Sequence, residues 1–443
     1  MDCLPDQKIN AIFYPKRLTF NIEATTETTE TTATIERMPF VIYVTPNFTA
    51  NAVRFINTLA SMPDIRVGLI SQEALHLLPQ EMGSRLNCHW QLEDVFDKNS
   101  VVETIRSWKN QFGRPHRILG TVEHLQVPLA EVRELLSVDG MRLKAAMNFR
   151  DKSRMKSMFR EAGIPCAAHK LISSEQQAWE FGEAHGYPII VKPPAGAGAQ
   201  ATFKVGGPGD MTKALRELNP NSDHELLLEK YIQGIEHSFD TFSLNGQPVF
   251  HSLTQYYPNP LEVLGEPWIQ WQVVLPREVE DKKYDDIRYV AFKALEVLGM
   301  ETGLSHLEWF CRPDGSIVIS EVAARPPGAQ ITSMMSYAND FNAVEAWARM
   351  MIFGTFDPPK RKYAVGTAYL RGQGRGKVKA VYGLDQVINE VGHLIVESKI
   401  PETGQSPLPS YEGEGYIILR HPETEAVKAA LSRVVETVRV ELG

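Results

Sequence analysis

Apolar and polar positions follow different patterns in the first and later parts of the chain. Between residues 38 and 140, short apolar runs at 39–47 and 66–70 alternate with amphipathic stretches at 51–63 and 101–112. Short apolar runs are typical of buried strands, whereas apolar residues every three or four positions are typical of helices. Strands that alternate with helices favour an open, mostly parallel sheet.

Beyond residue 140 the pattern becomes strand-rich. The stretch 151–165 is predicted to form a helix, because Gly163 and Pro165 mark its end. An amphipathic helix is expected over 283–299, and a β-hairpin is expected over 305–322. Further strand-like runs lie at 187–193, 201–205, 225–232, 237–244 and 248–257.

Composition indicates where these zones begin and end. Residues 1–37 include a Thr/Glu-rich segment that we expect to be disordered, because it cannot bury enough apolar surface to offset chain entropy. The sequence FDPPKRK at 356–362 is typical of a linker. We therefore expect an N-terminal α/β domain over 38–140, a central region over 141–355 and a C-terminal α+β domain over 356–443.

Charge and cysteine content exclude several classes of protein. The 443 residues are 43% hydrophobic and 23% charged, with a formal net charge of −8. This balance is not that of a nucleic-acid-binding protein or a protein that binds anionic membranes. The four cysteines are scattered, as expected in a reducing compartment. Because no apolar run approaches the ~18 residues of a membrane helix and no signal peptide is evident, we expect a cytoplasmic protein.

The predicted hairpin places two carboxylates opposite each other. In LEWFCRPDGSIVISE, Asp314-Gly315 suits a two-residue turn. With that turn, Glu308 faces Glu321 across the hairpin; a three-residue turn with a bulge would shift the pairing by one position. Opposed like charges destabilise a sheet, so a cation between them is one interpretation, and Mg²⁺ carrying nucleotide phosphate suits such oxygens. Solvation of both side chains on an exposed face is the alternative.

The same register has consequences for two cationic side chains. It places His306 opposite Ala323, and it keeps Arg325 on the face of the glutamates if the strand continues. An arginine beside paired carboxylates suits contact with a phosphate or an acyl phosphate, because its guanidinium matches phosphate oxygens. An ion pair with one of the glutamates explains Arg325 without any ligand.

A lysine and a loop of small residues follow another apolar strand. Lys192 lies at the end of the run in PIIVKPPAGAGAQATFKV. Small residues in the loop 195–201 allow backbone N–H groups to approach phosphates closely. The loop is not a Walker loop, which has Gly-Lys-Ser/Thr at the start of a helix. A plain flexible turn explains the loop alone, but lysine at the end of a buried strand favours an anion nearby.

The stretch ELLLEKYIQGIEHSFD offers a candidate adenine site. The chain leaves a buried strand at Glu229 to Ile232, where free backbone groups can pair with an adenine edge. Glu236, a few residues further on, is suitable for ribose hydroxyls. A strand followed by a charged surface turn is the alternative.

Taken in this order, the motifs resemble the ATP-grasp superfamily over residues 38 to 443. The resemblance is greatest to the branch of biotin carboxylase, carbamoyl-phosphate synthetase and the ATP-grasp amino-acid ligases. It implies an α/β (α+β) fold: a Rossmann-like N-terminal domain, a central ATP-grasp region of two subdomains and a small C-terminal α+β domain. The motifs are RDKSRMKSMFREAGIPCA, PIIVKPPAGAGA, LLLEKYIQGIEHSFD and HLEWF…ISEVAAR.

The resemblance also implies roles for individual residues. Glu308 and Glu321 would bind Mg²⁺ (or Mn²⁺), and Arg325 and Lys192 would act on the transferring phosphate. The family has an asparagine where this chain has Ala323, so we expect a water or His306 to fill the gap. The residues expected to bind ATP are Lys152, Lys192, Gly196, Gly198, Ala199, Glu229, Lys230, Tyr231, Ile232, Glu236 and His306.

The activity implied is activation of a small carboxylate as an acyl phosphate, followed by attack of an amine. The acid and the amine are small molecules, and many relatives are homodimers. A bicarbonate-activating enzyme and a nucleotide-binding protein without turnover are the alternatives. Candidate substrate contacts are Trp268, in the Pro- and Trp-rich stretch 258–271, and Arg371. A packed surface loop and a solvated hairpin explain them equally well, and Glu123 and His124 are weaker candidates at a strand end.

Overall fold

The computed structural model describes residues 38–196, 202–266, 268–408 and 410–443. The predicted N-terminal tail and two of the predicted loop residues, Gly198 and Ala199, lie outside these ranges. Within them, no helix is both long enough and apolar enough to cross a bilayer.

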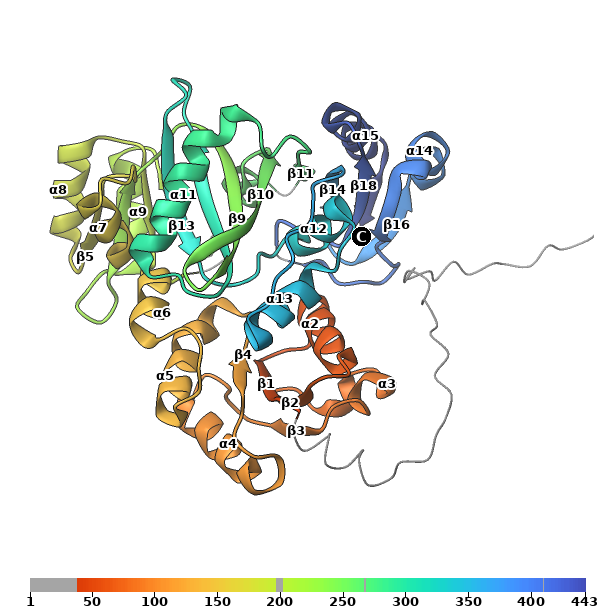
Figure 1. The fold of residues 1–443 in the computed structure, drawn as a ribbon. Helices are drawn as coiled ribbons and strands as arrows, with labels where there is room; N and C mark the ends of the chain where they lie inside the picture. The colour runs from red at the N-terminus through yellow and green to blue at the C-terminus, as the bar shows by residue number, and fades with distance from the viewer. Residues whose placement is uncertain (1–37, 197–201, 267, 409) are drawn as a thin grey trace, which may run out of the picture.

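The N-terminal region forms a parallel four-stranded sheet in the order β3-β2-β1-β4, as the alternating pattern predicts (Figure 1). All six positions of β1 are buried, because helices cover both faces of the sheet. Its elements are β1 (Phe40–Thr45), α2 (Ala50–Ser61), β2 (Arg66–Ser71), α3 (Gln80–Gly83), β3 (Cys88–Gln91), α4 (Lys98–Phe112), β4 (Arg117–Leu119) and α5 (Gln126–Leu136).

A second, antiparallel four-stranded sheet has the order β5-β8-β6-β7. It follows α6 (Leu143–Arg150) and α7 (Lys152–Glu161), the predicted helix. Asp151 caps α7 by accepting hydrogen bonds from Ser153 N and Arg154 N, which fixes Lys152 at the first helical position. The sheet and its helices are β5 (His169–Ile172), α8 (Glu175–His185), β6 (Ile189–Lys192), β7 (Phe203–Val205), α9 (Pro208–Leu218) and β8 (Leu226–Lys230).

The largest sheet is antiparallel, with eight strands in the order β13-β12-β9-β10-β11-β14-β18-β17. The predicted central and C-terminal regions share this sheet, because β11 pairs with β14 across the linker at 356–362. Its strands are β9 (Ile235–Leu244), β10 (Gln247–Tyr257), β11 (Gln272–Leu275), β12 (Gly303–Cys311), β13 (Ile317–Ala323), β14 (Ala364–Leu370), β17 (Ile395–Lys399) and β18 (Gly415–His421).

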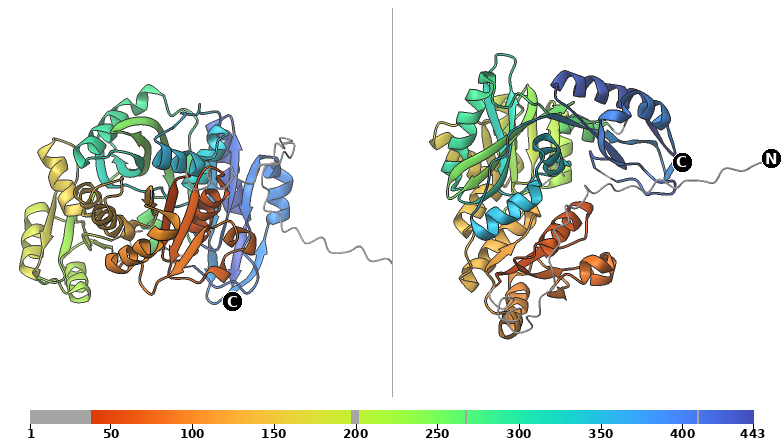
Figure 2. Two further views of the ribbon diagram at one scale, coloured as in Figure 1. Left: turned by 60° about the horizontal axis from the view of Figure 1, so that its bottom comes forward. Right: turned by 45° about the vertical axis from the view of Figure 1, so that its right-hand side comes forward.

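Helices and a small sheet complete the C-terminal half. Helix α13 packs on α2, where the rings of Trp347 and Phe55 meet edge to face at 5.1 Å, and so joins the N-terminal domain to the large sheet (Figure 2). The remaining elements are α10 (Pro260–Gly265), α11 (Asp285–Leu298), α12 (Ile331–Asn339), α13 (Ala343–Phe353), α14 (Leu384–Val391), α15 (Thr424–Thr437), and β15 (Gly372–Gly374), β16 (Val378–Tyr382) and β19 (Arg439–Leu442) of the small sheet.

Candidate active site

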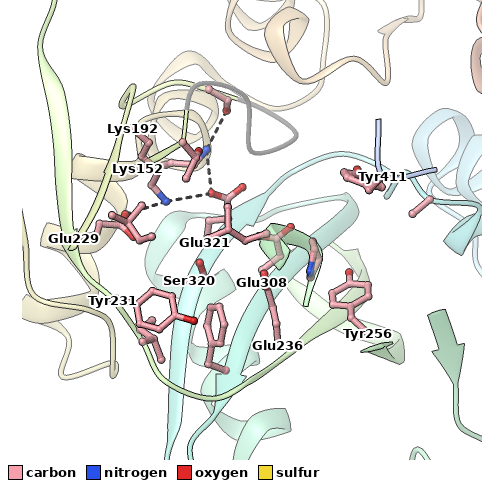
Figure 3. A pocket seen from close by; sticks show the side chains of 18 of the residues that line it. Lys152, Lys192, Glu229, Tyr231, Glu236, Tyr256, Glu308, Ser320, Glu321 and Tyr411 are labelled. Atoms are coloured by element: carbon pink, nitrogen blue, oxygen red, sulfur yellow. Dashed lines mark hydrogen bonds and ion pairs between the residues drawn. The ribbon is translucent and has the colours of Figure 1, made fainter. Parts of the chain in front are cut away.

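A pocket lies between the sheet of β5 to β8 and the large sheet (Figure 3). It brings together residues from α7, β6, β8, β9, β12 and β13, which are far apart in the sequence. Eleven of the predicted site residues line it: Lys152, Lys192, Gly196, Glu229, Lys230, Tyr231, Ile232, Glu236, Glu308, Glu321 and Arg325.

The hairpin of β12 and β13 has the predicted pairing at its glutamate end, but not for the predicted reason. Its tip is a three-residue loop, because Arg312 pairs with Ser316 and Gly315 adopts a positive φ of 79°. The two-residue turn was therefore a wrong prediction. A bulge at Ser320 offsets the shift, so Glu308 still lies opposite Glu321 and His306 opposite Ala323.

Two lysines hold the Glu321 carboxylate. Its Oε2 is 3.1 Å from Lys152 Nζ and 3.9 Å from Lys192 Nζ, as the dashed lines in Figure 3 show. Burial alone would raise the pKa of Glu321, but the two lysines outweigh burial and lower it to about 2. The carboxylate is thus ionised at neutral pH and surrounded by positive charge.

A third lysine was missed by sequence reasoning. Lys156 is fully buried, and its Nζ donates to the Ser320 carbonyl at the bulge, 2.6 Å away. It also lies 3.4 Å from Glu229 Oε1, which is 3.1 Å from Lys192 Nζ. The available signal was helical spacing: Lys156 follows Lys152 by four residues, so both share one face of α7.

Glu229 therefore faces lysines at the end of β8. Burial would raise its pKa, but Lys156 and Lys192 lower it below the ordinary value. The Lys230 side chain turns away from the pocket and donates to Gly186 O and Tyr187 O. Lys230, Tyr231 and Ile232 line the pocket where we predict the adenine edge, but the backbone N–H groups of Lys230 and Tyr231 already donate to Ala168 O and Pro188 O.

Three carboxylates crowd the middle of the pocket. Glu236 is buried, and its pKa is raised well above the ordinary value by burial and by Glu308 and Glu321. A divalent cation would relieve this repulsion. The described residues contain no group of three or more His, Cys, Asp or Glu placed to hold a metal. Mg²⁺ needs only one or two carboxylates when phosphate oxygens and waters complete its shell, so Glu308 and Glu321 fit a metal that arrives with a nucleotide.

His306 lies behind this group and does not line the pocket. Its Nδ1 is 2.6 Å from Asp240 Oδ1, and its Nε2 is 3.6 Å from Glu308 Oε1. Burial would lower the pKa of His306, but the two carboxylates raise it to about 9. With both ring nitrogens protonated, His306 positions Glu308 rather than offering a lone pair to a cation. The position opposite it is a buried alanine, Ala323.

Arg325 lines the pocket beyond the end of β13, held by the N-terminal domain. Its Nε donates to Glu123 Oε2 at 2.7 Å, and the two side chains are 20% and 11% exposed. Arg150 lies 3.9 Å from the other Glu123 oxygen and donates to the Gly196 carbonyl. The weakly supported candidate Glu123 thus links Arg325 to the base of the loop at 195–201.

The two candidate substrate residues do not line the pocket. The Trp268 side chain is 63% exposed. Arg371 is buried, and its guanidinium donates to the carbonyls of Glu266 and Ile269. Arg371 therefore holds the chain on either side of Trp268 in place.

Aromatic residues form one end of the pocket: Tyr256 from β10, Trp271 beside β11 and Tyr411 from the loop before β18; Trp271 belongs to the Pro- and Trp-rich stretch 258–271, whereas no motif indicated the two tyrosines. They come from three separate parts of the chain, so no local spacing relates them. In Figure 3, Tyr256 and Tyr411 lie on the side of Glu308 that is away from the lysines.

Comparison with known proteins agrees with this geometry. Residues 158–344 match the family described as "D-ala D-ala ligase C-terminus". The L-arginine-specific L-amino acid ligase of Bacillus subtilis is 25% identical over 292 residues, which are 62% of this chain and 67% of that protein. Alignment with the D-alanine–D-alanine ligase of Geobacillus kaustophilus spans 58% of its length, at 27% identity and over 48% of this chain.

Solved structures are similar over nearly the whole chain. An L-amino acid ligase from Bacillus licheniformis superposes with a TM-score of 0.73 at 17% identity, covering 92% of this chain and 99% of that one. A carboxyaminoimidazole ribonucleotide synthase from Aspergillus clavatus, complexed with ATP, gives 0.68 at 16% identity, covering 90% and 99%. With the matched motifs and the pocket that they build, these likenesses show that the chain has the ATP-grasp fold.

Proposed function

We propose that this protein is an ATP-dependent carboxylate–amine ligase. It would convert a small acid, such as an amino acid, to an acyl phosphate and join it to an amine, releasing ADP and phosphate. The observation that carries this proposal is the placement of Glu308 and Glu321 opposite each other on one hairpin, within reach of Lys152 and Lys192, in a pocket that continues to the predicted adenine edge.

In the first step, a carboxylate oxygen of the acid attacks the γ-phosphorus of ATP, and the bond to the β,γ-bridging oxygen breaks. Lys152, Lys192 and Arg325 would neutralise the charge that spreads over the phosphoryl oxygens. Mg²⁺ held by Glu308 and Glu321 would supply further charge neutralisation when bound. His306 would keep the Glu308 carboxylate in place.

In the second step, the lone pair of the amine attacks the acyl carbon and the C–O bond to phosphate breaks. The nitrogen loses a proton as the amide forms, and phosphate leaves. The Arg325 guanidinium, held by Glu123, is suited to orient the departing phosphate.

The likeness to the Bacillus ligases supports an amino acid as one substrate, and the ATP complex of a solved relative supports ATP as the nucleotide. Mg²⁺ as the metal and a homodimer remain predictions.

The experiment is a measurement of ADP and phosphate release over a matrix of acids and amines, with and without Mg²⁺. We expect release only when ATP, the metal, an acid and an amine are all present, with a peptide-like amide as the product in mass spectra. Release that depends on bicarbonate but not on amines would favour a bicarbonate-activating enzyme. Nucleotide binding without release under any condition would favour a protein that has lost turnover.

A further inference from the structure

The pocket has two ends of opposite chemical character, with the three carboxylates between them (Figure 3). One end holds Lys152, Lys192 and Glu229 and suits the nucleotide. The other end is lined by aromatic residues that pack on one another: Tyr256, Trp271 and Tyr411. Nothing in the proposed chemistry of phosphate transfer uses this aromatic end.

The rings at the aromatic end form a packed group around Trp271. Its indole stacks on Tyr256 at 5.6 Å and on Tyr369 at 4.9 Å, and Tyr411 meets it edge-on at 4.7 Å. Ring pairs at these separations stabilise each other beyond the area that they bury. The aromatic end is therefore built before any ligand arrives.

Two polar atoms of this group are bonded to backbone carbonyls, whereas the hydroxyls of Tyr256 and Tyr411 lie within range of the Glu308 charge. Trp271 Nε1 donates to the Pro258 carbonyl at 3.1 Å, and the Tyr369 hydroxyl donates to the Ala329 carbonyl. Trp271 and Tyr256 are only 1% and 4% exposed, so a ligand at this end meets the half-buried Tyr411 ring rather than the donor of Trp271. Such a surface favours apolar groups, because they lose no hydrogen bonds to water when they are buried there.

The aromatic end also lies next to the centre of phosphate transfer. Tyr411 is close enough to Arg325, Glu308 and Glu321 for their charges to act on its hydroxyl. The carboxylate of the acid has to reach the γ-phosphate near these groups. The side chain of the acid then extends toward the aromatic end. Arg371 donates to the carbonyls of Glu266 and Ile269 and so fixes the segment that precedes Trp271. Trp271 is thereby held in position by contacts outside the pocket.

We propose that the aromatic end binds the side chain of the acid substrate, and that this side chain is apolar: a branched aliphatic or aromatic group of the size found in leucine or phenylalanine. The inference rests on the proposed ligase function. An acid with a charged side chain would have to bury that charge against ring faces. An acid without a side chain would leave the rings uncovered.

The first test uses the wild-type protein. Phosphate release is measured with ATP, Mg²⁺ and alanine as a common amine, while the acid is leucine, phenylalanine, methionine, glycine, aspartate, lysine or arginine. We expect kcat/KM for leucine, phenylalanine and methionine to exceed the values for glycine and the charged acids by about tenfold or more. A preference for glycine or aspartate would overturn the inference. A preference for arginine or lysine would also overturn it and would instead indicate that the rings hold a cation.

The second test removes one ring. Tyr411→Ala is expected to raise KM for the preferred apolar acid about tenfold while the Kd for ATP stays close to wild type, and the melting temperature is expected to fall because the ring packs on Trp271. Tyr411→Phe, which keeps the ring, is expected to recover most of the apolar preference. Tyr289→Ala removes a tyrosine that is 69% exposed on α11 and serves as the matched control. Equal losses for apolar and charged acids in Tyr411→Ala would show that the ring does not select the side chain.

The two proposals fail in different ways. If no acid supports release in the wild-type protein, the ligase function is wrong, and this inference fails with it. If release occurs with acids of another class, the ligase function stands and only the assignment of the aromatic end is overturned.

Discussion

The charged end and the aromatic end of the pocket are stabilised by different forces. At the charged end, lysines from α7 and β6 neutralise carboxylates from β8 and β13, so each group depends on a partner of opposite charge. At the aromatic end, rings from β10, from β14 and from the loop before β18 pack around Trp271. Loss of a partner at the charged end leaves a buried charge uncompensated, whereas loss of a ring leaves a gap. The charged end is thus less tolerant of substitution.

The largest effect is expected for Glu321→Gln, which removes a predicted metal ligand and the partner of Lys152 and Lys192. We expect kcat/KM to fall about a thousandfold, because the positive charges of Mg²⁺, Lys152 and Lys192 that stabilise the transferring phosphoryl group are no longer held in place. Phosphate release as a function of Mg²⁺ concentration measures this. Glu296→Gln, an exposed carboxylate on α11, is the control. Activity within tenfold of wild type would contradict the assignment of Glu321.

A smaller loss is expected for Lys156→Met. Glu229 then keeps Lys192 as its only close ammonium partner among the described residues, so Lys192 is held more firmly and is less available to phosphate. We expect the Kd for ATP to rise about tenfold and the free energy of unfolding to fall by roughly 2 kcal/mol. Calorimetric titration with ATP and thermal unfolding provide the two measurements.

A second substitution separates this effect from a loss of packing. In Lys156→Met with Glu229→Gln, no carboxylate remains to retain Lys192, so part of the ATP affinity is expected to return. Lys213→Met on α9, at a side chain 82% exposed, is the surface control. If the double variant binds ATP no better than Lys156→Met, the lysine does not act through Glu229.

Glu123→Gln tests the connection between the N-terminal domain and the charged end. The amide still accepts a hydrogen bond from Arg325 but no longer offers a negative charge. We expect kcat to fall about fivefold with little change in the Kd for ATP, because Arg325 is positioned less firmly. Steady-state kinetics gives the result, with Asp139→Asn, at an exposed side chain of the same domain, as control. A change confined to ATP affinity would place Arg325 elsewhere in the reaction.

The smallest effect is expected at the back of the aromatic end. Arg371→Met removes the donor to Glu266 and Ile269 without touching the pocket. KM for the apolar acid is expected to rise two- to threefold while the Kd for ATP stays the same, because the Trp271 wall becomes less fixed. A larger rise for charged than for apolar acids would point to direct contact between Arg371 and a substrate carboxylate.

The same contrast explains what could be predicted from the sequence. A charged residue at the end of an apolar strand is unusual, so Lys192, Glu229 and Glu321 can each be recognised from the sequence as a candidate site residue. The pairing of Glu308 with Glu321 was predicted correctly only because the bulge at Ser320 cancels the effect of the longer loop. Bulges leave no clear mark in a single sequence, and neither does the packing that assembles Tyr256, Trp271 and Tyr411.

The predicted alternation of strands and helices in the first domain was confirmed, since buried parallel strands have a strong local signature. The sheet that joins the central and C-terminal regions was not foreseen. The linker at 356–362 suggested a boundary, but pairing between β11 and β14 depends on contacts about 95 residues apart, which a local pattern does not encode.

The bulge at Ser320 also divides the hairpin into a variable part and a fixed part. Lys156 and Pro165 hold the strand by its backbone at Ser320 and Ile319, while the tip at 313–315 is exposed. An insertion or deletion at the tip can be absorbed by the ladder between tip and bulge, without passing on to Glu321. Changes in the length or sequence of the tip during evolution would therefore leave the pairing of Glu308 with Glu321 unchanged.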